Sequence, residues 1–252
     1  MPSLIVSQQQ SAVFILTLNR PDKKNAISRA MYQAMADALK AAATNPSIKV
    51  IVLNSSSDNF TSGNDIVDFL KDPNMQPDSP VYQFLQALVT CPLPIIAAVK
   101  GFAIGIGSTL LLHCEQVLAE QSAQFALPFI NLGLVPEAGS SMLLPRQIGY
   151  QQAADLLLTG RSFSAEEAQR LGFISRVVKD ANQAAVDYAN LLAEKPRSGL
   201  IETKRLLRKD DEALQNRLQD ELESFVRHLN ADAAKEALTA FTEKRKADFT
   251  RF

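Results

Sequence analysis

The 252-residue sequence contains little of several features that mark common functional classes. It has two cysteines, Cys91 and Cys114, whose spacing matches no metal-binding motif, so we expect buried free thiols and a reducing compartment. The formal net charge is −1, and no basic stripe is present, which argues against nucleic acid as the main partner. The apolar runs are all too short to cross a bilayer, so we expect no membrane partner.

Targeting signals and repeats are also missing from the sequence. The first residues do not combine a charged region with an apolar run, and the last three do not match the peroxisomal Ser-Lys-Leu address. We therefore expect a cytoplasmic protein. Because 46% of the residues are hydrophobic, the chain can bury a sizeable core.

The patterning of the first two thirds of the chain predicts alternating strands and helices. Predicted strands cover residues 13–18, 49–54, 95–99, 115–119 and 124–127. Predicted helices cover residues 29–43, after Ser28 as the N-cap, and then 81–89 and 108–114. A loop is expected around Pro73, Pro77 and Pro80. This order predicts an α/β fold in which β-β-α units stack as the turns of a spiral.

The composition changes near the end of the chain. Prolines and glycines nearly disappear after Gly199, and amphipathic helices are predicted over residues 201–207, 212–229 and 231–249. We therefore divide the chain into a spiral core, residues 1–195, and a C-terminal helical region, residues 196–252. Three such helices cannot bury their apolar faces alone, so they must pack on the core or on another subunit.

Two glycine-containing segments are the most informative part of the sequence. Phe60-Thr61-Ser62-Gly63-Asn64-Asp65 and the stretch from Gly101 to Thr109 each lie where an apolar strand gives way to a helix-like stretch. Two such turns can direct two backbone N–H groups at one oxygen, which makes an oxyanion hole. Ordinary close packing of a helix on a strand would also explain Gly105 and Gly107. The strict Gly-x-Gly-x-x-Gly spacing of a dinucleotide site is absent.

A third segment, from Gln124 to Ser141, completes a pattern that resembles the crotonase superfamily, also called the enoyl-CoA hydratase/isomerase family. The matches are Asn19-Arg20-Pro21 with Lys24-Asn25-Ala26, the two glycine segments, and Gln124-Phe125 through Gly139. Their order and spacing agree with the family over residues 4 to about 180, and the helical tail fits as well.

The resemblance implies a spiral of β-β-α turns with a C-terminal helical trimerisation region, in a homotrimer or homohexamer. It implies an acyl-CoA thioester as substrate, with no cofactor and no metal, since coenzyme A is part of the substrate. By position, the two oxyanion-hole amides are those of Asn64 and Ile106. Many family members have glycine where this chain has Ile106, a difference expected to narrow the acyl pocket. Further substrate contacts are implied for Lys24, Ala26, Ser62, Gly63, Asp65, Ile66, Gly105, Thr109, Phe129 and Leu134.

The side chains at the catalytic positions decide which reaction is expected. The family's hydratases have two glutamates, and the matching positions here hold Thr109 and Phe129, neither of which can activate water. The acid in Val135-Pro136-Glu137-Ala138-Gly139 matches the Δ3,Δ2-enoyl-CoA isomerase branch. The resemblance therefore implies an isomerase of fatty-acid β-oxidation with Glu137 as its base. The alternatives are another crotonase-type CoA chemistry on the same scaffold, such as hydration by a rearranged site, and a non-catalytic acyl-CoA-binding protein.

Each of these residues also has a structural explanation. Glu137 can be an acid in the first turn of a helix, favoured by the helix dipole. Asp65 and Asp68 fit a turn and a helix start, Thr109 fits a packed helix position, and His113 fits a satisfied core histidine. The cations Arg20, Lys23 and Lys24 either belong to a solvated turn or hold the phosphates of CoA.

Overall fold

The computed structural model describes residues 3–71, 75–208, 211–243 and 245–252. Pro73 of the expected proline-rich loop and Lys244 of the last predicted helix lie outside them. The strands, in chain order, are β1 (Ile5–Gln10), β2 (Val13–Leu18), β3 (Val50–Ser55), β4 (Ile95–Val99), β5 (Phe102–Ile104), β6 (Gln116–Glu120), β7 (Gln124–Ala126), β8 (Ser162–Ser164) and β9 (Arg176–Val178).

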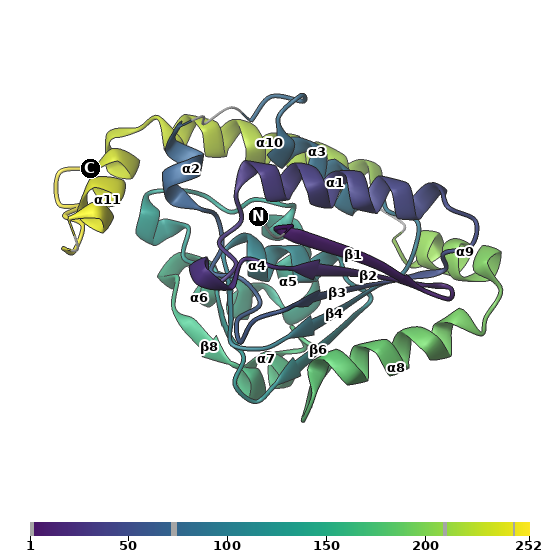
Figure 1. Ribbon diagram of the computed structural model, residues 1–252. Coiled ribbons are helices and arrows are strands. Elements are labelled where there is room, and N and C mark those ends of the chain that lie inside the picture. Colours follow the sequence, from purple (N-terminus) through teal and green to yellow (C-terminus); the bar gives the residue numbers. More distant parts are fainter. Residues whose placement is uncertain (1–2, 72–74, 209–210, 244) are drawn as a thin grey trace.

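Helices connect the strands and make up most of the C-terminal region (Figure 1). The α-helices are α1 (Arg29–Thr44), α2 (Ile66–Lys71), α3 (Pro80–Val89), α4 (Ile106–Thr109), α5 (Ser140–Ile148), α6 (Tyr150–Thr159), α7 (Ala165–Leu171), α8 (Ala181–Ala193), α9 (Arg197–Leu207), α10 (Asp211–Leu229) and α11 (Asp232–Thr242). Short 3₁₀ helices are η1 (Pro21–Lys23), η2 (Leu110–His113) and η3 (Ile130–Leu132).

The strands form two sheets, and the chain alternates between them. The larger sheet has the order β1-β2-β3-β4-β6-β9 and is parallel apart from the β1–β2 hairpin. The smaller has the order β5-β7-β8. Because β4, β6 and β9 belong to the first sheet while β5, β7 and β8 belong to the second, each turn of the chain from β4 onwards adds one strand to each sheet. This is the predicted crotonase-like spiral of β-β-α turns, which the structure confirms.

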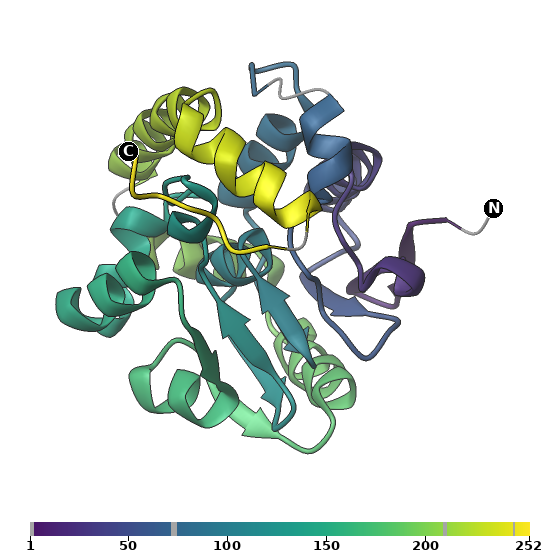
Figure 2. The ribbon, with the colours of Figure 1, turned by 90° about the vertical axis from the view of Figure 1, so that its left-hand side faces the viewer.

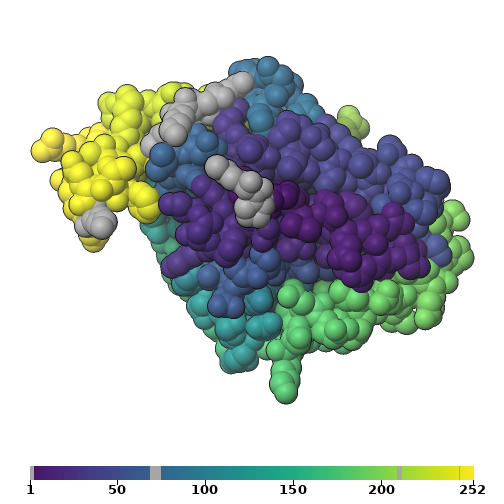
Figure 3. Space-filling model, in the orientation of Figure 1, coloured from purple at the N-terminus to yellow at the C-terminus, as the bar shows by residue number. Residues whose placement is uncertain are grey.

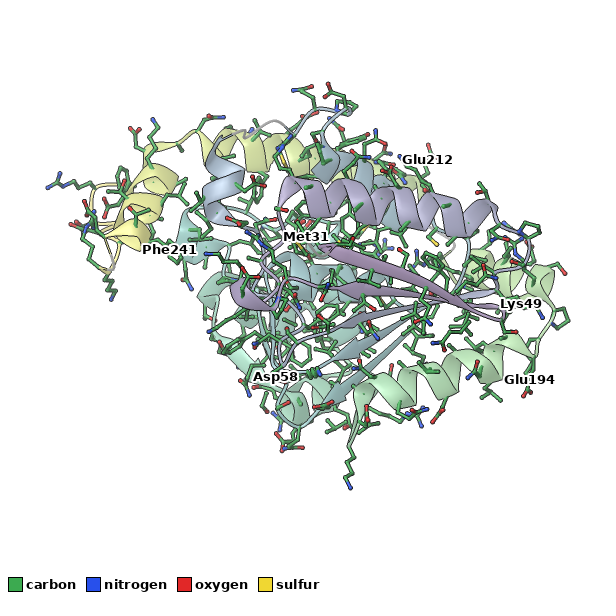
Figure 4. The ribbon with its side chains drawn as sticks, in the orientation of Figure 1. Met31, Lys49, Asp58, Glu194, Glu212 and Phe241 are labelled. Atoms are coloured by element: carbon green, nitrogen blue, oxygen red, sulfur yellow. The ribbon has the colours of Figure 1, made fainter. Side chains whose placement is uncertain are left out.

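Both faces of the larger sheet are buried, which explains its almost continuously apolar strands. Along β4, Ile95, Ala97 and Val99 point into the main core, whereas Ile96 and Ala98 point to a second cluster under α8. Helix α1 covers the opposite face. The side chain of Met31 in this helix, labelled in Figure 4, is fully buried there. The helix begins where the sequence predicts, because the Ser28 hydroxyl accepts a hydrogen bond from the Met31 amide.

Two predicted helices differ from the observed ones. The expected helix at 108–114 is split into α4 and η2, since Leu110–His113 continues as a tighter 3₁₀ turn. The expected helix at 231–249 ends at Thr242, because Arg245 turns back and pairs with Glu236 on α11. The end of the chain therefore runs back along α11 and forms part of a projection of the surface, at the left of Figure 3.

The C-terminal helices pack on the core of their own chain. Phe225 and Leu229 of α10 and Ala234 of α11 belong to the main hydrophobic cluster, and α11 lies against η3. Figure 2 shows α11 beside α2, so residues far apart in the sequence meet at this end of the molecule. In the described part of the chain, none of the helices is long and apolar enough to cross a bilayer.

Candidate active site

A cavity of about 900 Å³ opens where the glycine segments, the third segment and the C-terminal helices meet. This is the size of a small-molecule site. Ten residues that the sequence analysis named line it: Ala26, Ser62, Gly63, Asn64, Asp65, Ile66, Gly105, Ile106, Phe129 and Leu134. Segments separated by up to a hundred residues are thus brought together at one site.

The sequence analysis did not predict the part of the lining that comes from the C-terminal helices. Phe225 of α10 and Phe241 of α11 face the same cavity as Val67 of α2. Figure 4 labels Phe241 on α11, near the projecting C-terminal end. The amphipathic patterns predicted helices here, but only the tertiary structure places two of their aromatic side chains against a ligand cavity.

Asn64 and Ile106 both line the cavity, and neither backbone N–H has a hydrogen-bond acceptor among the described residues. Ile106 is the first residue of α4, where an N–H group has no partner within the helix. Gly105 precedes it with φ 58° and ψ −119°, a conformation essentially restricted to glycine. The backbone thus presents two unsatisfied donors to one cavity, as an oxyanion hole requires.

Asn64 is held on both of its sides. A parallel bridge joins it to Ile27, whose carbonyl oxygen accepts a hydrogen bond from the Asp65 amide. Its side-chain oxygen accepts a 2.5 Å hydrogen bond from the Tyr32 hydroxyl. Burial, and then the negative charge of Glu137, raises the pKa of Tyr32 well above its usual value, so this hydroxyl keeps its proton.

Glu137 is a buried carboxylic acid, and only 7% of its surface is exposed. Its Oε1 accepts a 2.5 Å hydrogen bond from the Thr109 hydroxyl. Burial raises the pKa of Glu137 to about 8, the Thr109 hydrogen bond opposes the rise, and the nearby charge of Glu221 adds to it. Thr109 belongs to α4, the helix that begins with Ile106, so this hydrogen bond joins the carboxylate to the helix that carries the Ile106 amide.

Three residues with predicted roles are not part of the cavity lining. Lys24 and Glu137 are absent from it, and Thr109 is fully buried with its hydroxyl on Glu137. Thr109 therefore supports the acid directly, while a contact between Thr109 and substrate stays a prediction. Phe129 lines the cavity as expected, so the two positions that hold glutamates in the family's hydratases here present a hydroxyl and an aromatic ring.

The loop from Arg20 to Ala26 forms one wall of the cavity. Arg20 is committed to a 2.7 Å ion pair with Asp65, and the Lys24 ammonium lies 5.3 Å from the centre of the Phe102 ring. The Ser62 amide donates to the Lys24 carbonyl oxygen, which joins the loop to the first glycine segment. Lys23 lines the cavity, so of the three cations it and Arg20 reach the site directly.

Asn25 organises this loop from within. It is fully buried with a left-handed backbone, φ 55°. Its side-chain amide donates to Ser55 and to the carbonyl oxygens of Asn59 and Phe60, and its side-chain oxygen accepts from the Arg20 amide. One buried side chain thus connects the loop to the chain entering the first glycine segment.

The spiral of β-β-α turns, with two free amides facing one cavity, defines a protein of the crotonase superfamily. A comparison with family models agrees, since the model described as enoyl-CoA hydratase/isomerase matches residues 8–251. The chain belongs to the enoyl-CoA hydratase/isomerase family.

The proteins similar to this chain include both hydratases and isomerases. The chain is 36% identical to the 2,3-dehydroadipyl-CoA hydratase of Escherichia coli and 35% identical to the 1,2-epoxyphenylacetyl-CoA isomerase of the same organism, with 99% of each chain covered in both cases. A solved structure of an enoyl-CoA hydratase/isomerase from Pseudoalteromonas atlantica superposes with a TM-score of 0.94 and 38% identity, covering 98% of this chain and 100% of that one. These likenesses establish an enzyme family that includes more than one reaction.

Proposed function

We propose that this protein is an acyl-CoA isomerase that moves the double bond of a 3-enoyl-CoA to the 2-position. The observation that carries the proposal is the buried carboxylate of Glu137, whose pKa of about 8 suits proton transfer near neutral pH. Its hydrogen bond from Thr109 connects it to α4, the helix that begins with Ile106. The reaction uses no metal, nicotinamide or flavin.

The mechanism uses one base and one oxyanion hole. Glu137 removes a proton from C2 of the 3-enoyl thioester, and the electrons of that C–H bond form a dienolate whose negative charge rests on the thioester oxygen. The amides of Asn64 and Ile106 donate hydrogen bonds to that oxygen, a contribution of roughly 3 kcal/mol for each donor. Glu137 then returns the proton to C4, which leaves the double bond between C2 and C3.

Hydration is the main competing activity, because hydratase names predominate among the similar proteins. Adding water across a double bond needs a carboxylate that positions and activates the water. Thr109 and Phe129 occupy the two positions where the family's hydratases carry glutamates. Because neither of these side chains is a carboxylate, and Thr109 instead donates a hydrogen bond to Glu137, the isomerase is the better match.

The proposal requires that substrate binding opens a path to Glu137. The carboxylate lies outside the cavity lining, which Phe129 and Leu134 provide on this side. We propose that these two side chains shift when the acyl chain enters, so that C2 comes within reach of the carboxylate. Catalytic geometry is often incomplete in a ligand-free site and tightens in the substrate complex.

The test uses purified protein with two substrates. With 3-hexenoyl-CoA an isomerase produces the conjugated 2-enoyl thioester, which is followed by its ultraviolet absorbance. With 2-hexenoyl-CoA a hydratase removes that absorbance. We expect turnover of the 3-enoyl substrate alone. Turnover of the 2-enoyl substrate alone would establish a hydratase, and tight binding of hexanoyl-CoA with no turnover of either would establish a binding protein.

We also propose that the protein assembles as a homotrimer or homohexamer. Tyr150 and Leu158 on α6 are 78% and 73% exposed, and Leu207 at the end of α9 is 77% exposed. Large apolar side chains at such exposure suit contacts between copies. Light scattering coupled to size-exclusion chromatography tests this, and a mass near 27.6 kDa, that of one chain, would contradict it.

A further inference from the structure

Helix α10 carries a buried acid on its apolar face. Leu214, Leu218, Phe225 and Leu229 form the buried stripe of this helix, and Glu221 lies within the same stripe with 6% of its surface exposed. Acidic side chains are almost never this buried without partners. An acidic residue such as Glu221 at an apolar position of an amphipathic pattern can be seen in the sequence, but the sequence does not show which groups it contacts.

Glu221 holds the start of α5, immediately after Glu137. Its Oε2 accepts a 2.6 Å hydrogen bond from the Gly139 amide, and its Oε1 accepts a 2.8 Å bond from the Ser141 amide. Gly139 is the N-cap residue of α5 and has no side chain to cap the helix. The carboxylate of α10 therefore supplies the cap from 80 residues away, with its charge at the positive end of the helix dipole.

The residue between Glu137 and Gly139 has a strained backbone. Ala138 has φ 60°, a left-handed conformation that residues with a Cβ rarely adopt. Its carbonyl oxygen lies 2.7 Å from Nε2 of His113, which is buried and kept neutral because burial lowers its pKa to about 3. Nε2–H of the imidazole thus donates to Ala138, while Glu221 holds the next residue along the chain.

We propose that Glu221 is a positioning residue for the Glu137 base, because it holds the strained Ala138–Gly139 turn that aims the Glu137 side chain. The inference deepens the proposed function and rests on it. It makes the C-terminal helical region a working part of the catalytic site, in addition to its contribution to the cavity wall.

The charge of Glu221 has a second effect that can be measured. The charged or titratable groups acting on Glu137 are Glu221 from α10 and Tyr32 from α1, with the Thr109 hydroxyl from α4. On Glu221 itself, burial raises the pKa, while the two amides and Arg217 on the same helix oppose the rise. Because the Glu221 charge raises the pKa of Glu137, removing it moves that pKa down.

Two substitutions separate position from charge. Glu221→Gln keeps the length of the side chain but removes the charge and one acceptor, whereas Glu221→Asp keeps the charge but is too short to reach both amides. Glu223→Gln is the matched control, since Glu223 is exposed on the same helix. The readouts are kcat and KM for 3-hexenoyl-CoA across pH, hexanoyl-CoA binding as a check of folding, and the ¹³C titration of the Glu137 carboxyl.

We expect kcat to fall roughly 10- to 100-fold in both Glu221 variants, with KM changed far less. The reason is that displacing the base slows the chemical step more than it weakens substrate binding. The acid limb of the rate profile and the ¹³C midpoint move to lower pH in Glu221→Gln by about half a unit or more, and stay in place in Glu221→Asp. Glu223→Gln behaves as the wild type.

Three results would overturn the inference: an unchanged kcat in Glu221→Gln, a loss of kcat in it with no movement of the acid limb or of the ¹³C midpoint, or an equal loss in Glu223→Gln. Should Glu221→Gln not fold, unchanged kcat in Glu221→Asp would overturn it instead. If the wild type does not isomerise 3-hexenoyl-CoA, the proposed function fails by itself, and the ¹³C midpoints still decide whether Glu221 acts on Glu137.

Discussion

The hydroxyl of Thr109 donates a 2.5 Å hydrogen bond to Oε1 of Glu137. One residue comes from the second glycine segment and the other from the third, 28 positions later. The bond joins the helix that presents the Ile106 amide to the acid that we propose as the base. Where the family's hydratases carry a second carboxylate, this site has the neutral Thr109 hydroxyl, which orients the Glu137 carboxylate.

The first prediction concerns the base itself. Glu137→Gln keeps the shape and the acceptor for Thr109 but removes the basic site, so we expect isomerase kcat to fall by about 10²- to 10⁴-fold. Hexanoyl-CoA affinity, measured by calorimetry, should stay within a few-fold of wild type. Glu212→Gln is the control, an exposed acid labelled in Figure 4. Retention of most of the wild-type rate would rule out Glu137 as the base.

The second prediction concerns the pH profile. Glu137 must be ionised to act, so kcat/KM should rise with pH to a midpoint near 8, where its pKa lies. Thr109→Val removes a hydrogen bond that lowers this pKa, so the midpoint should move up. Thr44→Val, at an exposed threonine at the end of α1, should leave it in place. A midpoint that is lower or unchanged in Thr109→Val contradicts this role of the bond.

The third prediction links the same group to stability. The pKa of Glu137 rises from 4.5 to about 8 on folding, so the folded state holds its proton more tightly than the unfolded chain. The associated stability is complete below about pH 4.5 and is lost as the pH rises to 8, at roughly 1.4 kcal/mol per unit. The melting temperature of Glu137→Gln should therefore exceed that of wild type by a margin that grows as the pH rises from 5 to 9. A margin that is the same at every pH would refute this.

The fourth prediction tests the oxyanion hole through its backbone. In Gly105→Ala no atom lies within 4 Å of the new Cβ, so the effect comes from the backbone conformation alone. The peptide that ends in the Ile106 amide should rotate, and kcat should fall by about 10²- to 10³-fold, as when one donor is lost. Gly149→Ala is matched, with φ 85° and equally open space. It should lower stability and leave kcat unchanged, and equal effects on kcat would contradict the role of Gly105.

The fifth prediction concerns the loop under the proposed CoA site. Asn25→Ala removes the hydrogen-bond partner of the Arg20 amide and of the Phe60 carbonyl oxygen, which costs about 1–3 kcal/mol for each uncompensated group. Thermal unfolding should therefore occur at a lower temperature. The KM for 3-hexenoyl-CoA should rise with little change in kcat, because the loop lines the cavity and carries neither the proposed base nor the proposed oxyanion-hole amides. A loss confined to kcat would place the loop in the chemistry instead.

Local patterns in the sequence predicted part of the fold, while β1, β5, β8, β9, α2 and the helices from α5 to α8 were not predicted. The apolar strands, the Ser28 cap and the order of the glycine segments depend on neighbouring residues, so they are visible without the structure. The two helices that differed did so for tertiary reasons. The chain after Thr242 turns back because Arg245 finds Glu236, a pairing that helical periodicity does not reveal.

The candidate site was predictable where it depends on the backbone. The glycine segments indicated an oxyanion hole because turns after strands can present free amides, and the resemblance to the family pointed to Asn64 and Ile106, which both line the cavity. The hydrogen bond from Thr109 to Glu137 and the places of Phe241 and Glu221 were not predicted. Their partners lie 28 to more than 80 positions away, so only folding brings them together.

By itself, the sequence determined the spiral fold, the family and the absence of glutamates at positions 109 and 129. These follow from which residue types occupy which positions. The tertiary structure decided how acidic Glu137 is, which residue donates a hydrogen bond to it, and that the C-terminal helices both line the cavity and cap the helix that follows Glu137. The pKa of a carboxyl group depends on the water and the charges around it, and those are set by segments that meet only in the folded protein.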